Sequence, residues 1–140
     1  MKDLMIEGVA DPVTEARRYV ENAHEALRNN EKYDPETDSY DDRKYVRTAG
    51  HYLWNSVLII LNAVFQVETK KGRSDINDYR MAVAPRDRKL LTILNNAYNI
   101  LHLYMGYDGV LDKKVCDQGF HVANEIIDRC EKMLPVRPTA

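Results

Sequence analysis

The side chains best suited to chemistry in this 140-residue chain are four histidines, one in each long amphipathic segment. Histidine is the commonest metal ligand and a frequent acid–base catalyst near neutral pH. His24 completes a Glu-x-x-His sequence that starts at Glu21, and Glu125 follows His121 at the four-residue spacing of one helix face. Carboxylate-bridged di-iron bundles use two such motifs and two further glutamates. Because the chain has one motif, that site is not predicted.

The helix faces on which the histidines lie limit a shared metal site. His51 and His121 share their faces with polar residues, which indicates solvent exposure, whereas His24 and His102 lie at the edges of apolar stripes. The polar neighbours of His51 are Arg47, Thr48 and Asn55. The sequence therefore predicts no metal and no cofactor, and a histidine-based site on His24 and His102 stays open as an alternative.

Other reactive groups have structural interpretations. Cys116 and Cys130 are 14 positions apart in one predicted helix, about 21 Å along its axis, which is beyond disulfide reach. Two reduced, partly buried thiols follow. The chain has no Gly-x-Ser-x-Gly sequence and no glycine-rich phosphate loop, so neither common framework for hydrolysis or phosphate binding is present.

The elements that must position these side chains are helices. Apolar residues return every three or four positions in four segments, the spacing of one face of an α-helix. The stripes are Val13, Ala16, Val20, Ala23 and Leu27; Tyr45, Ala49, Tyr52, Ser56, Ile60 and Val64; Leu90, Leu94, Ala97, Leu101 and Met105; and Val115, Val122, Ile126, Cys130 and Met133. We therefore predict an all-α protein, an antiparallel up-down four-helix bundle with one extra short helix.

Capping and breaking residues place the boundaries. We expect a leader over residues 1–10, a single bundle domain over 11–134 and a tail over 135–140. The long helices are predicted over about residues 12–29, 42–67, 86–105 and 112–134, with a short helix that starts at Ser74 or Asp75 and ends before Pro85. The first helix is expected to open at Asp11, the second at Asp41 or Asp42, and the last at Asp112.

The second and fourth long helices carry apolar residues outside their main stripes. A helix that is apolar most of the way round is central or is buried against a second molecule. We therefore predict self-association, with a two-fold dimer favoured, through these two helices. The predicted interface residues are Leu58, Ile59, Asn62, Ile93 and Ile100.

Charge and hydropathy bear on partners and location. The net charge of −2 gives no general attraction to nucleic acid, which makes nucleic acid an unfavoured partner. A local basic patch is expected at one end of the bundle, opposite an acidic loop over residues 30–42. Its residues are Lys70, Lys71, Arg73, Arg86, Arg88 and Lys89. No apolar run approaches the roughly 20 residues of a membrane span, so no membrane partner and a cytoplasmic location are expected.

Two stretches resemble HEPN-type helical bundles: YVRTAGHYL at residues 45–53, which leads into a long apolar helix, and NNAYNILH at residues 95–102. The chain is also similar to small uncharacterised helical-bundle families. The resemblance implies an RNA-directed module; HEPN ribonucleases place an arginine four to six residues before a histidine. That arginine is missing before His102, while Arg18 precedes His24 at a suitable distance.

The leading prediction is a non-enzymatic helical-bundle protein that associates with itself or with another protein. The first alternative is a HEPN-like RNA-directed module or ribonuclease that uses Arg18 and His24 as catalytic residues. The second is a metal-binding bundle that uses His24 and His102. The sequence names neither the ligand nor the pathway.

Overall fold

The computed structural model describes residues 11–67 and 75–135, and within these ranges the regular structure is helical with no strand. The elements are α1 (Pro12–Asn30), α2 (Arg43–Phe65), α3 (Ile76–Val83), α4 (Arg88–Ala97), η1 (Tyr98–Tyr107) and α5 (Lys113–Glu131). The all-α prediction is confirmed. The predicted leader over residues 1–10 and most of the predicted tail lie outside the described residues, as do Lys70, Lys71, Arg73 and Ser74.

Aspartates set the starts of the α-helices. In each of the five, the N-cap aspartate accepts hydrogen bonds from backbone N–H groups of the first turn, which have no partner inside the helix. These caps are Asp11, Asp42, Asp75, Asp87 and Asp112. The sequence placed the start of the fourth long helix at Arg86, two residues early, because Pro85 can open a helix. The Asp87 cap moves the start to Arg88.

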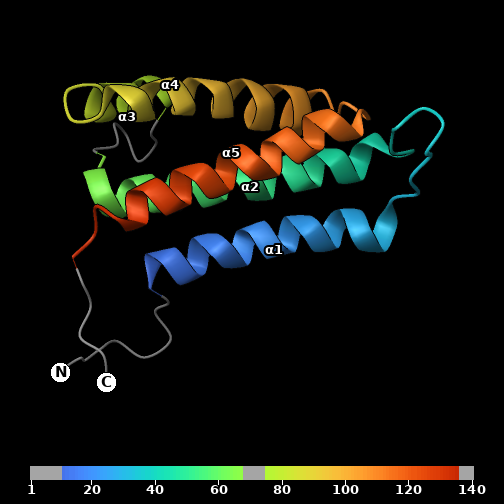
Figure 1. Ribbon diagram of the computed structural model, residues 1–140, viewed down its shortest axis with the longest axis horizontal. Helices are drawn as coiled ribbons and strands as arrows, with labels where there is room; N and C mark the ends of the chain where they lie inside the picture. Colours follow the sequence, from blue (N-terminus) through green and yellow to red (C-terminus); the bar gives the residue numbers. More distant parts are fainter. Residues whose placement is uncertain (1–10, 68–74, 136–140) are drawn as a thin grey trace.

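Packing places α2 and α5 at the centre of the molecule. α2 contacts α1, η1 and α5, and α5 also contacts α1, α4 and η1 (Figure 1). The predicted stripes are buried over most of α1, α4, η1 and α5, with Leu101 and Ile126 among the largest fully buried side chains. In α2 the buried face is shifted from the predicted stripe, because Val46, Leu53 and Val57 are fully buried whereas Tyr45, Tyr52 and Val64 are half-buried. Within the described part of the chain, no helix has both the length and the apolar character that crossing a membrane requires.

The predicted fourth long helix is not one uniform α-helix. It is α over α4 and becomes a π-helix in η1, where Asp108 N–H donates to the carbonyl of Leu103, five residues back, at 2.8 Å. The predicted stripe is nonetheless buried, because Ala97, Leu101 and Met105 recur at four-residue intervals that a wider turn also keeps on one face. π-Helices are rare, and those that occur are frequently found at functional sites.

Two glycines bring α2 and η1 into backbone contact. A Cβ atom added to Gly50 would lie 2.5 Å from the backbone nitrogen of Gly106 and 2.7 Å from the Cβ of Met105. A Cβ added to Gly106 would lie 2.8 Å from the carbonyl oxygen of Leu101. Glycine at position 50 therefore permits this close approach of α2 and η1. The approach places Arg47 and His51, on either side of Gly50 in α2, next to the end of η1.

The acidic loop between α1 and α2 is tightly folded. Asp34 and Ser39 exchange backbone hydrogen bonds, and Glu31 accepts from the N–H groups of Asp41 and Asp42 through its Oε1 at 3.1 and 2.8 Å. The second carboxylate oxygen of Glu31 is buried without a hydrogen-bond partner. Burial and the adjacent carboxyl of Asp41 raise the pKa of Glu31, whereas the bond from the Lys32 N–H and the bond to Glu31 lower the pKa of Asp41.

Candidate functional site

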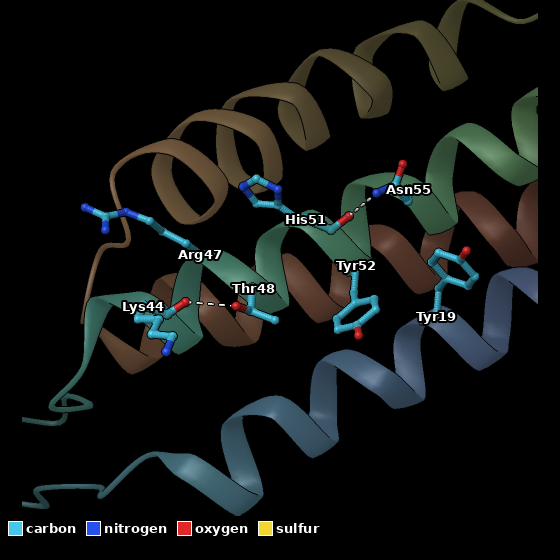
Figure 2. Close-up of a pocket in the computed structure, with 7 residues that line it drawn as sticks. All are labelled: Tyr19, Lys44, Arg47, Thr48, His51, Tyr52 and Asn55. Carbon is cyan, nitrogen blue, oxygen red and sulfur yellow. Dashed lines mark hydrogen bonds between the residues drawn. The ribbon is translucent and has the colours of Figure 1, made fainter.

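A surface groove of ≈490 Å³ runs along the exposed side of α2, where α2 faces α1 (Figure 2). Its lining residues are Tyr19, Lys44, Arg47, Thr48, His51, Tyr52 and Asn55. All seven belong to the described part of the chain, and none of them is acidic. The groove thus combines two permanent positive charges, one histidine, two phenols, one hydroxyl and one amide.

The end of η1 holds two of the groove's side chains in place. His51 donates from Nε2 to the carbonyl of Gly106 at 2.9 Å, because a carbonyl oxygen can only accept. Arg47 donates from Nε to the carbonyl of Tyr107 at 3.2 Å. Arg43, one helical turn earlier, donates to the carbonyls of Asp108 and Gly109 at 3.3 Å each. Three side chains at four-residue intervals on α2 therefore satisfy carbonyls that the end of a helix leaves open.

This anchoring decides which atoms remain for a ligand. With its proton on Nε2, a neutral His51 presents an unprotonated Nδ1. Arg47 keeps both terminal nitrogens, for which no partner exists among the described residues. Figure 2 shows Arg47 and His51 along the η1 side of the groove, with Lys44 and Tyr52 along the α1 side.

The floor and the α1 wall of the groove are built from α2 and Tyr19. Thr48 donates its hydroxyl hydrogen to the carbonyl of Lys44 at 3.0 Å, and Asn55 donates to the carbonyl of His51 at 2.9 Å. The rings of Tyr19 and Tyr52 meet edge to face, with centroids 6.0 Å apart and planes 80° apart. Both rings therefore have fixed positions, and the oxygens of Thr48 and Asn55 remain open as acceptors.

An aromatic face adjoins the groove on the other side of His51. It consists of Trp54, Tyr98 and His102, with ring centroids 5.1 to 5.8 Å apart. A second cavity of ≈180 Å³ lies beside it, and Trp54, His102 and Tyr107 are among its lining residues. His102 and Tyr107 are exposed, and the Arg80 guanidinium lies over the Tyr98 ring, with its Cζ 5.4 Å from the ring centroid. α2 and η1 thus present one continuous aromatic surface.

The residues of the two predicted alternative sites each contact other side chains within the described chain. Arg18 pairs with Glu15 at 3.5 Å on the exposed side of α1. His24, six residues later and so roughly 240° round the helix, stacks on Phe120 of α5 with centroids 3.9 Å apart. His102 stacks on Tyr98 instead. Within residues 11–67 and 75–135, no three His, Cys, Asp or Glu side chains are placed to hold a metal ion.

The predicted interface residues differ in how much of their surface the single chain buries. Ile93 is 7% exposed and belongs to the core of the single chain, so it offers no surface to a partner. Leu58, Ile59 and Ile100 are half-buried against that core, and Ile100 lies beside Gly119 of α5. Asn62 is exposed. The sequence pattern separated apolar from polar faces but did not distinguish a second core face from a free one.

Of the predicted basic patch, the structure describes Arg86, Arg88 and Lys89, and Arg86 already contacts other groups of the chain. The Arg86 guanidinium lies 4.8 Å over the ring of Phe65 and donates to the carbonyl of Val64 at 3.4 Å. Arg88 and Lys89 are exposed at the start of α4. The other three predicted members, Lys70, Lys71 and Arg73, lie outside the described residues.

The two cysteines are inert in the folded chain. Cys116 and Cys130 are free and buried. Burial is the main reason that each has a pKa raised to about 12. A thiol with such a pKa is almost entirely protonated at neutral pH and is a poor nucleophile.

Comparison with known proteins places the chain in a family. Residues 11–132 match a family described as a domain of unknown function, DUF5618. The chain belongs to the DUF5618 family. A solved structure described as a protein of unknown function from Dyadobacter fermentans is similar with a TM-score of 0.77 and 37% sequence identity, over 86% of this chain and 93% of that one. None of the curated proteins compared matches the sequence significantly.

Sequence reasoning recognised the polar face of this DUF5618 chain but not the site on it. The prediction that His51 shares an exposed face with Arg47, Thr48 and Asn55 is confirmed. The missed signal is the spacing of Arg43, Arg47 and His51, which repeats every four residues. Such a row of donors is suited to the end of a neighbouring helix, but the sequence does not show which helix end lies there.

Proposed function

We propose that this DUF5618 domain acts without catalysis, through protein binding, as a homodimer that forms on the aromatic face of Trp54, Tyr98 and His102. The domain is proposed to be cytoplasmic, with its four long helices in the antiparallel up-and-down order expected from the sequence. The leading sequence interpretation is self-association through the second and fourth long helices. We keep these two helices as the interface but propose a different surface on them, beside the apolar residues predicted from the sequence.

The observation that carries this proposal is an aromatic surface on α2 and η1, half-buried at Trp54 and Tyr98 and exposed at His102, with no acidic residue among those that line the cavity beside it. The Tyr98 and His102 rings stack, Trp54 meets Tyr98 edge to face and lies tilted to His102, and Tyr107, at 76% exposure, lines the adjoining cavity with Trp54 and His102. Aromatic residues are enriched in the buried centres of protein interfaces. Large apolar patches of this kind on a folded domain mark interaction sites.

The charge of this face favours a second copy as the occupant. A two-fold interface places each patch against an identical patch, so like charges within it repel. The centre of the face is aromatic, and Arg80, which lies over the Tyr98 ring, donates to the side chains of Asn77 and Asn95. The surface can therefore pair with itself without bringing carboxylates or lysines together at its centre.

Light scattering of two matched variants tests this proposal. His102→Glu places a carboxylate in the face, and His121→Glu makes the same change on α5, where the histidine side chain is 81% exposed. We expect His102→Glu to weaken dimerisation at least about tenfold by burying like charges together. His121→Glu is expected to leave the dimer intact, and both variants should keep the helical content of the parent. Equal masses for the two variants would contradict this assignment.

A further inference from the structure

The groove along α2 has two cationic side chains, Lys44 and Arg47, and none of its lining residues is acidic. The other lining side chains are one histidine, two tyrosines, one threonine and one asparagine. Phosphate oxygens accept charge-assisted hydrogen bonds from the two cations, and arginine matches phosphate geometry with two parallel donors. A carboxylate in the lining would repel such an anion, and the lining has none.

Two of the groove's side chains, Arg47 and His51, are also held in position before any ligand binds. Arg47 is tied through Nε to the carbonyl of Tyr107, so its two terminal nitrogens have a fixed direction. His51 is tied through Nε2 to Gly106, which leaves Nδ1 toward solvent as an acceptor when neutral and as a donor when protonated. Fixed side chains lose less conformational entropy on binding than free ones.

Two aromatic rings line the same groove and limit the kind of phosphate ligand it fits. Tyr19 and Tyr52 are half-buried, packed edge to face, and one helical turn or more from the cations. A groove with cations along one part and aromatic rings along another is the arrangement that binds nucleotides, since phosphates pair with cations and bases stack on rings.

We propose that this groove binds the phosphate group of a nucleotide, with Lys44 and Arg47 on the phosphate and Tyr52 beside the base. The site stands on different residues from the dimer face and does not depend on it. The nucleotide is either free or part of a single RNA strand, and the two sources share this chemistry.

Titrations of the full chain, followed by backbone amide NMR shifts and calorimetry, test the site with adenosine 5′-monophosphate, adenosine and a four-nucleotide RNA. We expect the monophosphate to shift amides between Lys44 and Asn55 and to bind at least about tenfold more tightly than adenosine. Tighter binding of the RNA identifies a strand as the source, and equal binding identifies the free nucleotide. Binding of adenosine as tight as that of the monophosphate, or no shift with any of them, overturns the proposal.

A matched pair of lysine variants separates a built site from general charge attraction. Lys44→Gln is expected to weaken monophosphate binding about tenfold, the loss of one charge-assisted contact. Lys89→Gln removes the same charge from the exposed start of α4 and should leave binding unchanged. If the two variants weaken binding equally, the groove is not the site. His102→Glu should disrupt the dimer without changing monophosphate binding, which keeps the two proposals distinguishable.

Discussion

Gly50→Ala tests the contact that brings α2 against η1. The new methyl carbon would lie 2.5 Å from the Gly106 nitrogen and 2.7 Å from the Met105 Cβ. Since non-bonded carbon atoms pack at about 3.5–4.0 Å, the two helices must separate by roughly 1 Å. Such overpacking costs about 1–3 kcal/mol, and stretching the His51–Gly106 hydrogen bond costs about 1 kcal/mol more.

Alanine also recovers about 1 kcal/mol of helix propensity relative to glycine. The net loss is therefore about 2 kcal/mol, which for a chain of this size lowers Tm by roughly 6 °C. Thermal unfolding followed by circular dichroism measures this shift. The matched control is Gly119→Ala, where the added carbon would meet the Met105 sulfur at 2.6 Å and Leu101 Cδ2 at 3.0 Å.

The control separates backbone contact from side-chain contact. The ends of methionine and leucine side chains can rotate aside, whereas the backbone of η1 cannot. Gly119→Ala should therefore change Tm by less than roughly 3 °C, or about 1 kcal/mol. A Tm for Gly50→Ala equal to that of the parent, or an equal loss in both variants, would refute the argument that α2 and η1 touch through their backbones.

Three further predictions concern titratable groups. Because burial raises the pKa of Cys116 and Cys130 to about 12, iodoacetamide at pH 8 should label neither thiol in the folded chain; rapid labelling without denaturant would contradict this. The pKa of Glu31 is raised in the folded chain. Its contribution to stability is therefore fully present below pH 4.5, its ordinary pKa, and is lost as the pH rises through the pKa of the folded state. Glu31→Gln should therefore gain stability over the parent above pH 6 and lose this advantage near pH 4, as urea unfolding at the two pH values would show. Hydrogen bonds from Arg129 lower the pKa of Asp87. The stability that Asp87 contributes is therefore present above pH 3.8, its ordinary pKa, and is lost as the pH falls through the pKa of the folded state. Asp87→Ala should cost about 1 kcal/mol from the lost helix cap at pH 7 and much less at pH 2.

Periodicity and capping determined most of the architecture from the sequence. The stripe through Ala16, Val20, Ala23 and Leu27 is buried as predicted. These signals are local: an aspartate before an apolar repeat specifies a helix start whatever the helix later contacts. That is why Asp11 and Asp112 were placed correctly and Asp75 was one of the two starts expected for the short helix.

The π-helix and the groove depend on contacts between helices. A four-residue spacing from Ala97 to Met105 is compatible with an α-turn and with a wider one, so the sequence did not separate α4 from η1. Arg47 and His51 were placed on an exposed face, but their acceptors on η1 are about 55 to 60 residues away in sequence. Ile93 was assigned to an interface because nothing local shows that it is packed into the core of the single chain.

The mass of the parent chain in solution, measured by light scattering across a range of concentrations, tests the central claim most directly. Self-association through the aromatic face predicts a mass about twice the 16.2 kDa of one chain, which falls toward the single-chain value when His102 becomes glutamate. A single-chain mass at every concentration up to about 1 mM, where even weak homodimers form, would contradict it.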